Sequence, residues 1–211
     1  MSPRTRAQYQ QIRRQRRAQI LSAARQVFAQ QGFHDTKMSD IAQAAEVSQG
    51  TLYHYFSGKD DLFMSLFSNW AEQLEGTVQE LPAASISAAD KLRLMGQVGH
   101  AFLGSDRELL PVFVEYCAFA LHNPRAAISF RDLFQTIQHS MAQIIDEGIA
   151  RGEFKPVDTA TLSALPLVVL DGLILVALIV GRDVIVPEQV IDRTLELVFD
   201  GLLTEDGASR P

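Results

Sequence analysis

Residues 32–59 read GFHDTKMSDIAQAAEVSQGTLYHYFSGK, and this stretch decides the fold of the N-terminal part of the chain. A helix-turn-helix needs two short helices whose inner faces pack together, which leaves the outer face of the second helix exposed. Helical spacing predicts a first helix over about Met38–Ala45 and a second over Gln49–Tyr55, with Ser48 as a favoured N-cap. We therefore expect a helix-turn-helix at this place.

The residue types fit the two faces that such a motif requires. The inner face takes the apolar residues, which are Ile41, Ala42, Ala45, Val47, Leu52 and Phe56. At 3.6 residues per turn, the outer face of the second helix takes Gln49, Gly50, Tyr53 and His54, with Thr51 and Tyr55 on its flanks. Glutamine can bond adenine bidentately, threonine can meet a thymine methyl group, and tyrosine hydroxyls reach phosphates.

Two positions outside that face add to the predicted DNA contacts. Gly50 would let the backbone approach DNA closely. Lys59 opens the next helix, where its charge and the backbone N–H groups can hold a phosphate, although a solvated surface lysine is the alternative. The predicted DNA-binding residues are Lys37, Ser48, Gln49, Gly50, Thr51, Tyr53, His54, Tyr55 and Lys59.

The stretch quoted above strongly resembles the N-terminal domain of the tetracycline-repressor (TetR) family, and the resemblance covers about residues 13 to 67. The residues at the family's spacing are I41-A42, V47-S48, G50, L52-Y53, F56 and K59. The resemblance implies a homodimer with two-fold related reading heads on a palindromic DNA operator. It also implies a repressor that a small molecule releases.

Three residues depart from the family's usual pattern. Glu46 stands where a glycine is common in the turn, so a left-handed conformation there would cost about 1 to 2 kcal/mol. Lys37 replaces a common Ser or Thr, and Gly58 replaces a common Ser before Lys59. These changes affect individual caps and phosphate contacts but leave the packing pattern intact.

Charge is divided unevenly along the chain. The formal net charge is −6, but residues 1–60 carry nine Lys or Arg against four Asp or Glu, while residues 61–211 carry ten against twenty-one. A basic end on an acidic body suits a DNA-binding head. The basic arm consists of Arg4, Arg6, Arg13, Arg14, Arg16 and Arg17. It either enters a minor groove or is a solvated leader, and the sequence leaves both open.

Helical periodicity dominates the whole chain, so we expect an all-α fold of about nine helices. The expected parts are a basic arm and three-helix DNA-binding domain over residues 1–58, a connecting helix over 59–81, and a larger helical effector-binding and dimerisation domain over 82–211. Cap signals place helix starts near Ser87, at Asn123-Pro124, at Asp158 and at Pro187. We expect the first helix to end near Gln31, before Gly32.

Residues 162–180 are nearly continuous in apolar side chains and approach the length of a membrane span. A membrane-attached helical protein is therefore an alternative. Asp171 at the centre and the interruptions at Pro166 and Gly172 favour a buried helix, covered by its own domain and a second copy of the chain. Asp171 is then a partnered core acid, a dimer contact or a pocket group.

The body is rich in aromatic residues, most of which we expect to be ordinary core. The family resemblance makes a largely apolar effector pocket plausible. Its candidate lining residues are His100, Phe102, Phe113, Tyr116, Phe134, His139 and Asp171. His100, His122 and His139 lack the dense spacing of a metal site, so we expect no metal and no cofactor.

Enzymatic activity is the remaining alternative, for which no phosphate loop, HExxH motif or nucleophile elbow is present in the sequence. We accordingly expect no catalytic residues, although scattered acids and histidines can converge in space. The single cysteine, Cys117, fits a reducing cytoplasm, and the N-terminal residues lack the apolar region of a secretory signal. We expect a cytoplasmic regulator without a membrane partner.

Overall fold

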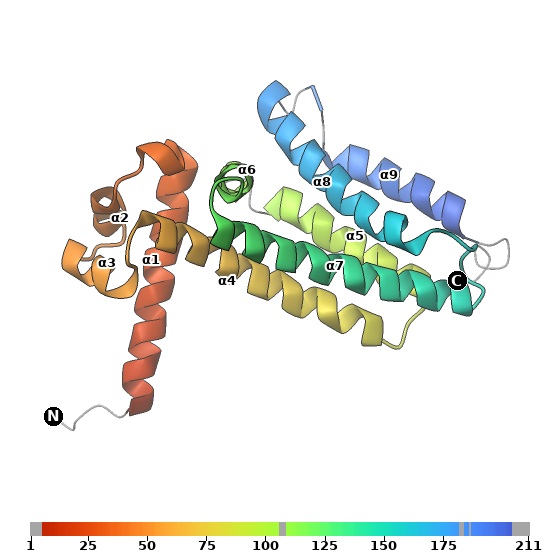
Figure 1. The fold of residues 1–211 in the computed structure, drawn as a ribbon, viewed down its shortest axis with the longest axis horizontal. Helices are drawn as coiled ribbons and strands as arrows, with labels where there is room; N and C mark the ends of the chain where they lie inside the picture. The colour runs from red at the N-terminus through yellow and green to blue at the C-terminus, as the bar shows by residue number, and fades with distance from the viewer. Residues whose placement is uncertain (1–5, 106–108, 182–183, 186, 204–211) are drawn as a thin grey trace. The chain divides into compact units, whose positions relative to one another are not determined.

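The structure is a computed structural model that describes residues 6–105, 109–181, 184–185 and 187–203. Within these residues the chain forms nine α-helices and one short 3-10 helix, which confirms the all-α prediction. In chain order the α-helices are α1 (Arg6–Asp35), α2 (Met38–Ala44), α3 (Gln49–Tyr55), α4 (Lys59–Glu80), α5 (Ala88–Ser105), α6 (Leu109–Ala120), α7 (Pro124–Ala150), α8 (Thr159–Val180) and α9 (Pro187–Leu202) (Figure 1). They fall into two compact units, residues 1–70 with 111–126 and residues 71–110 with 127–211.

The first unit is built on the apolar faces of α1, α2 and α3. The side chains that helical spacing places inside are buried, and each one larger than alanine contributes roughly 1.5 to 3 kcal/mol of hydrophobic stabilisation. They are Ile20, Leu21, Ala24, Val27, Phe28, Ile41, Ala42, Ala45, Leu52 and Phe56. The predicted inner faces of the helix-turn-helix are thus confirmed, except that Val47 in the turn is only half-buried.

Helix α1 begins earlier than expected and is interrupted near its end. It starts at Arg6, so most of the predicted basic arm is helical, whereas Arg4 lies outside the described residues. Gly32 has φ 76° and ψ 164°, a conformation that glycine adopts at little cost, and the regular helix stops there as predicted. One further turn leads to Asp35, and the Thr36 hydroxyl donates to the Gly32 carbonyl at 2.6 Å.

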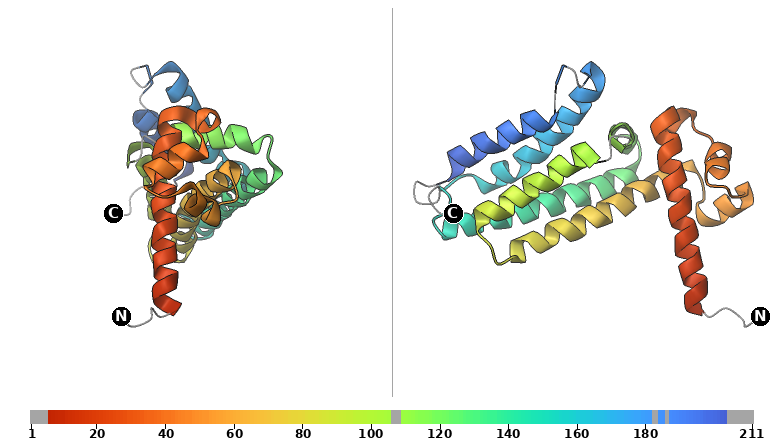
Figure 2. Two further views of the ribbon diagram at one scale, coloured as in Figure 1. Left: turned by 90° about the vertical axis from the view of Figure 1, so that its left-hand side faces the viewer. Right: turned by 180° about the vertical axis from the view of Figure 1, so that it is seen from behind.

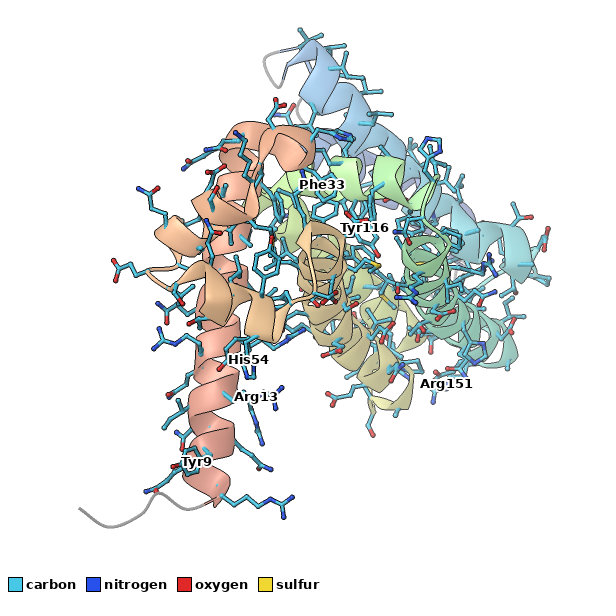
Figure 3. All side chains as sticks on the ribbon, turned by 60° about the vertical axis from the view of Figure 1, so that its left-hand side comes forward. Tyr9, Arg13, Phe33, His54, Tyr116 and Arg151 are labelled. Carbon is cyan, nitrogen blue, oxygen red and sulfur yellow. The ribbon has the colours of Figure 1, made fainter. Side chains whose placement is uncertain are left out.

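An aromatic cluster joins α1, α4 and α6 within the first unit. The Phe63 ring lies 4.4 Å from the Phe33 ring and 5.5 Å from the Phe119 ring, measured between centroids. Tyr116 stacks on Phe67 at 3.8 Å, and its hydroxyl donates to the Ala126 carbonyl at 3.4 Å. Figure 3 shows Phe33 and Tyr116 inside this cluster. Residues of α6 therefore form part of the core that supports the helix-turn-helix.

The predicted helix starts at the caps are confirmed. The Asn123 side-chain oxygen accepts from the backbone N–H of Ala126 at 3.2 Å, and α7 begins at Pro124. The Ser87 hydroxyl oxygen accepts from the backbone N–H of Asp90 at 3.0 Å. Asp158 caps α8 in the same way, and α9 begins at Pro187.

In the second unit a buried ion pair ties α5 to α7, which run beside one another in both views of Figure 2. Lys91 is 2% exposed, and its ammonium group donates to the two carboxylate oxygens of Glu147 at 2.7 and 2.9 Å. It also donates to the Pro82 carbonyl at 2.8 Å. These three acceptors satisfy a charge whose burial alone would be strongly unfavourable.

Helix α8 runs through Pro166 and is the one helix of the described residues that is long and apolar enough to cross a membrane. Its inner residues, such as Leu173, Ile174 and Ala177, are buried within the second unit. Its other face exposes large apolar side chains, with Ile179 at 73%. Burial raises the pKa of Asp171 on this helix to about 6.

Candidate nucleic-acid interface

The recognition helix α3 is held by one buried residue and one cap. Leu52 is fully buried against the first unit, while Phe56 closes the helix as its C-cap. The Ser48 side-chain oxygen accepts from the backbone N–H of Thr51 at 3.0 Å and lies 2.8 Å from the Thr51 hydroxyl. The bounds of α3 are those predicted from the sequence, because both ends are fixed by local residues.

The outer face of α3 carries the polar set that the sequence placed there. Gln49, Tyr53 and His54 are exposed, and Tyr53 is 53% exposed although it is aromatic. A Cβ added at Gly50 would meet only the Ser48 hydroxyl oxygen, at 3.9 Å, so packing within the chain does not require glycine. An exposed glycine on this face is suited to a close approach of backbone and DNA.

The turn between α2 and α3 holds a non-glycine residue in the left-handed region. Glu46 has φ 52°, which is the left-handed conformation whose cost was considered from the sequence. The Val47 N–H donates to the Ala42 carbonyl at 2.9 Å, so the turn is hydrogen-bonded in spite of the strain. The turn thus stores about 1 to 2 kcal/mol of backbone strain directly before the recognition helix.

Two contacts that the sequence analysis missed join α1 to the ends of α2 and α3. The Gln19 side-chain amide donates to the carbonyl of Ala45, the C-cap of α2, at 2.8 Å. The Arg17 guanidinium lies over the ring of Phe56, 5.4 Å from its centroid. A cation over an aromatic face is attractive, so α1 is fixed against both helices at this level. Local spacing contains no signal for either contact.

Lys59 has different partners from the predicted phosphate. Its ammonium group donates to the carbonyls of Phe33, His34 and Thr36 at 2.6, 2.9 and 2.9 Å. Because an ammonium has three donors, these carbonyls use all of them. The sequence could not show this, since the acceptors lie 23 to 26 residues away. In this structure Lys59 closes the end of α1.

The start of α4 is also acidic rather than open to an anion. Asp60 and Asp61 lie in its first turn. The Asp61 carboxylate accepts from the backbone N–H of Ser57 at 2.8 Å and from the Ser57 hydroxyl at 3.1 Å. These carboxylates would repel a phosphate at this helix end. Lys37 differs, because its side chain is exposed at the start of α2 while its backbone N–H donates to Asp40 at 3.0 Å.

The candidate effector residues are divided between the two compact units. Phe113 and Tyr116 belong to the aromatic core of the first unit, with the Phe113 ring 5.8 Å from that of Trp70. His100 lies in the second unit with its ring nitrogen 4.0 Å from the Asp192 carboxylate. The side chain of Phe102 lies outside what the structure describes. That these residues line one effector pocket stays a prediction.

A pocket of about 480 Å³ that is largely open to solvent lies along α7 beside Gln79 of α4, in the second unit. Its lining is polar and includes one of the candidate effector residues, His139, whose ring lies 3.1 Å from the Gln143 side-chain nitrogen. The lining residues are Gln79, Asp132, Gln135, Thr136, His139, Ser140 and Gln143. The described residues contain no group of three or more His, Cys, Asp or Glu arranged to hold a metal ion.

Two family models match the chain and together cover most of it. The model of bacterial regulatory proteins of the tetR family matches residues 20–66, and that of the BetI-type transcriptional repressor C-terminal domain matches residues 88–203. The chain belongs to the TetR family. As a TetR-family protein it is a helix-turn-helix transcriptional regulator, which confirms the predicted family, fold and regulatory function. The membrane-attached alternative is not favoured.

Individual relatives agree with this assignment. The HTH-type transcriptional regulator UidR of Escherichia coli K12 is 31% identical over 151 residues, which are 71% of this chain and 74% of that protein. The crystal structure of FadR from Bacillus subtilis in complex with stearoyl-CoA is 26% identical, with a TM-score of 0.73 over 87% of this chain and 98% of that one. A TetR regulator from Haloarcula marismortui shares the fold, with 18% identity and a TM-score of 0.81 over 90% and 99% of the two chains.

Proposed function

We propose that this TetR-family protein is a repressor that binds a palindromic operator as a homodimer and leaves it when a small effector binds. The exposed polar face of α3, set by the buried Leu52 and the Ser48 cap, is the observation that carries the proposal. A helix held in this way can enter the major groove with its N-terminal residues at the base edges.

The side chains on α3 divide into base contacts and backbone contacts. Gln49, at the first helical position, is suited to bidentate bonding with adenine, and Thr51 to a thymine methyl group. Tyr53, His54 and Tyr55 are suited to phosphate oxygens on either side of the groove. Lys37 adds a positive charge at the start of α2, whereas the ammonium group of Lys59 bonds to backbone carbonyls at the end of α1.

The exposed face of α8 supports the homodimer. Its apolar residues recur at intervals of three and four, which is the spacing of a seam between packed helices. They are Leu165, Val168, Leu175 and Ile179, with Gly172 in the same stripe. A Cβ added at Gly172 would meet nothing within 4 Å, so a second helix has room to approach. We infer that two copies of α8 cover one another's apolar faces.

The effector site is the polar pocket along α7 beside Gln79 of α4, together with the neighbouring core of the second unit. Its volume lies within the usual range of about 300 to 1,000 Å³ for ligand pockets. The polar side chains of the lining can hydrogen-bond to polar groups of an effector, and the largely apolar effector expected from the sequence stays a prediction. The related FadR was crystallised with stearoyl-CoA, so acyl thioesters are sensible first probes.

DNA binding is tested by selecting duplexes from a random pool with the purified protein. We expect enrichment of an inverted repeat whose half-sites are separated by about 34 to 36 Å, one turn of DNA, or a multiple of it. Acyl thioesters and other metabolites are then added to the complex formed on the selected duplex. Release by one of them supports the effector site. Recovery of no preferred sequence would refute the proposed function.

The dimer is tested by the solution mass of the Leu175→Glu variant. Burying a charge in the seam would be strongly unfavourable, so we expect a monomer. Ile128→Glu is the matched control, because Ile128 is an exposed apolar residue of α7, and it should remain a dimer. If Leu175→Glu is dimeric, the seam is elsewhere.

We propose no catalytic activity, cofactor or membrane partner for this chain, and we place it in the cytoplasm, where its DNA would be. These points follow from the regulatory relatives and from the absence of enzymatic motifs in the sequence. Assays of the purified protein on the effector that releases it from DNA check the first point, since turnover of that compound would contradict it.

A further inference from the structure

The N-terminal part of α1 is a largely exposed helix, whose contacts with α2 and α3 are made by Gln19 and Arg17 near its end. Residues 6–19 are helical, and each of them is exposed except Arg16, which is half-buried. The buried face of α1 begins only at Ile20. Figure 1 shows this part of α1 projecting beyond α2 and α3. More than three turns of helix are therefore available to a partner.

All the charged residues of the projecting segment are basic. Residues 6–19 contain five arginines and no Asp or Glu, and the first acidic residue of the chain is Asp35. Three of these arginines fall on one side: at about 100° per residue, Arg6, Arg13 and Arg17 lie within about 40° of one another around the axis. Arg14 lies about 80° away from the centre of this stripe. We call Arg6, Arg13 and Arg17 the arginine stripe.

The position of the arginine stripe is fixed by its contact with the recognition helix. Arg17 lies over the ring of Phe56, which ends α3, so the stripe starts at the C-terminal end of that helix. Figure 3 labels Arg13 on the projecting part of α1 and His54 on α3. A DNA duplex that receives α3 would thus have the stripe at its flank.

We propose that the arginine stripe binds phosphates of the DNA backbone beside the major groove that receives α3. This inference rests on the proposed function and extends its DNA contact beyond the helix-turn-helix. An α-helix with its side chains is about 10 to 12 Å across, whereas the minor groove of B-DNA is about 6 Å wide. The segment from Arg6 onward therefore lies on the backbone and does not enter the minor groove.

An anionic membrane is the other polyanion that a basic helix can meet, and the composition of the segment disfavours it. Helices that lie in a membrane interface need a broad apolar face in addition to basic residues. Residues 6–19 offer only Tyr9 and Ile12 as large apolar side chains. Charge without an apolar face fits DNA phosphates better.

The test compares Arg13→Gln with Arg14→Gln on the duplex that the unchanged protein selects, over a series of salt concentrations. Each variant removes one charge from the same helix. A phosphate contact contributes about 0.9 to the slope of log K against log salt, and each substitution is present in both subunits of the dimer, so Arg13→Gln and Arg6→Gln should each lower the slope by about 1.8. Arg14→Gln should leave it within error. The same changes in slope are expected on a duplex of unrelated sequence, because the phosphates carry no sequence information.

Gln15→Pro tests whether the segment has to be helical. Proline inside a helix breaks it, but this variant keeps every arginine, and Gln15 is exposed, so the thermal unfolding of the head serves as a folding control. We expect a slope like that of the Arg6→Gln, Arg13→Gln double variant. Equal slopes for Arg13→Gln and Arg14→Gln, or an unchanged slope for Gln15→Pro, would overturn the proposal.

Two further measurements distinguish the phosphate contact from minor-groove reading and from membrane binding. Changing A·T pairs to G·C in the flanks should leave affinity unchanged, and a loss that depends on Arg6 or Arg13 would indicate minor-groove reading and overturn the proposal. The proposal would also be overturned if the unchanged protein binds phosphatidylserine vesicles rather than DNA and the double variant does not bind them. If the unchanged protein selects no duplex at all, the proposed function itself has failed.

Discussion

The carboxylate of Glu115 accepts a hydrogen bond from the backbone N–H of Phe33, with 2.6 Å between the two atoms. The carbonyl of Phe33 accepts from the ammonium group of Lys59 at 2.6 Å. Phe33, in the last turn of α1, is therefore held by α6 through its N–H and by α4 through its carbonyl. A change in α6 would reach the helix-turn-helix through this contact.

Removing the Glu115 carboxylate should destabilise the first unit. In the Glu115→Ala variant the N–H of Phe33, a residue only 7% exposed, loses its acceptor. An unpaired buried donor costs about 1 to 3 kcal/mol, which chemical denaturation measures directly. Glu115→Gln keeps an acceptor and should lose less than half as much. Equal stability of Glu115→Ala and the unchanged protein would show that the contact contributes nothing.

Lys59→Met should act on stability and leave the salt dependence of DNA binding unchanged. The variant leaves three carbonyls at the end of α1 without their charged donor, for an expected loss of about 1.5 to 3 kcal/mol. Lys37→Met is the control, because the Lys37 side chain is exposed and its loss from both subunits should lower the salt slope by about 1.8. If Lys59→Met lowers the salt slope of DNA binding and leaves stability unchanged, Lys59 contacts a phosphate as the sequence predicted.

Glu46→Gly should stabilise the protein by up to about 1 kcal/mol, because glycine adopts the left-handed conformation without strain. Part of this gain is offset, because glycine gives the unfolded chain more conformational entropy. Thermal unfolding gives the sign. The neighbouring Ala44 is the last residue of α2 and carries no such strain, so Ala44→Gly should instead destabilise, by less than about 1 kcal/mol. If Glu46→Gly and Ala44→Gly both destabilise the protein, Glu46 is not strained.

Stability should fall as pH rises from about 4 to about 6, owing to Asp171. Burial raises the pKa of this carboxyl from 3.8 to about 6, so in this range the folded chain keeps a proton that the unfolded chain has lost. The stabilisation is complete below the unfolded pKa and is lost as pH passes the folded one. Asp171→Asn should flatten this part of the stability profile, whereas Asp132→Asn, on an exposed residue, should not. An unchanged slope in Asp171→Asn would assign the pH dependence to other groups.

The sequence predicted best the elements whose ends are set by neighbouring residues. The bounds of α3 depend on Ser48 and a short apolar pattern, and the starts of α7 and α8 depend on Asn123 and Asp158. The early start of α1 was not predicted, because a run of Arg and Gln without apolar periodicity is typical of both a helix and a solvated leader.

What the sequence did not predict depends on contacts between distant residues. Glu115 meets Phe33 across 82 positions, and no local pattern marks either residue. Phe113 and Tyr116 were grouped with a ligand pocket because aromatic spacing is the same for a core and for a cavity wall. Only their packing on Trp70 and Phe67 distinguishes the two.

The central claim, that the outer face of α3 reads DNA bases, is tested most directly by the base preferences of Gln49→Ala. Affinities for the selected duplex and its single-base variants are measured at one salt concentration, with Gln73→Ala, an exposed glutamine of α4, as the control. We predict that Gln49→Ala loses about 5- to 150-fold of discrimination at one symmetric base position, equivalent to about 1 to 3 kcal/mol, and that Gln73→Ala loses none. A preference profile for Gln49→Ala that matches the unchanged protein at every position would contradict the claim.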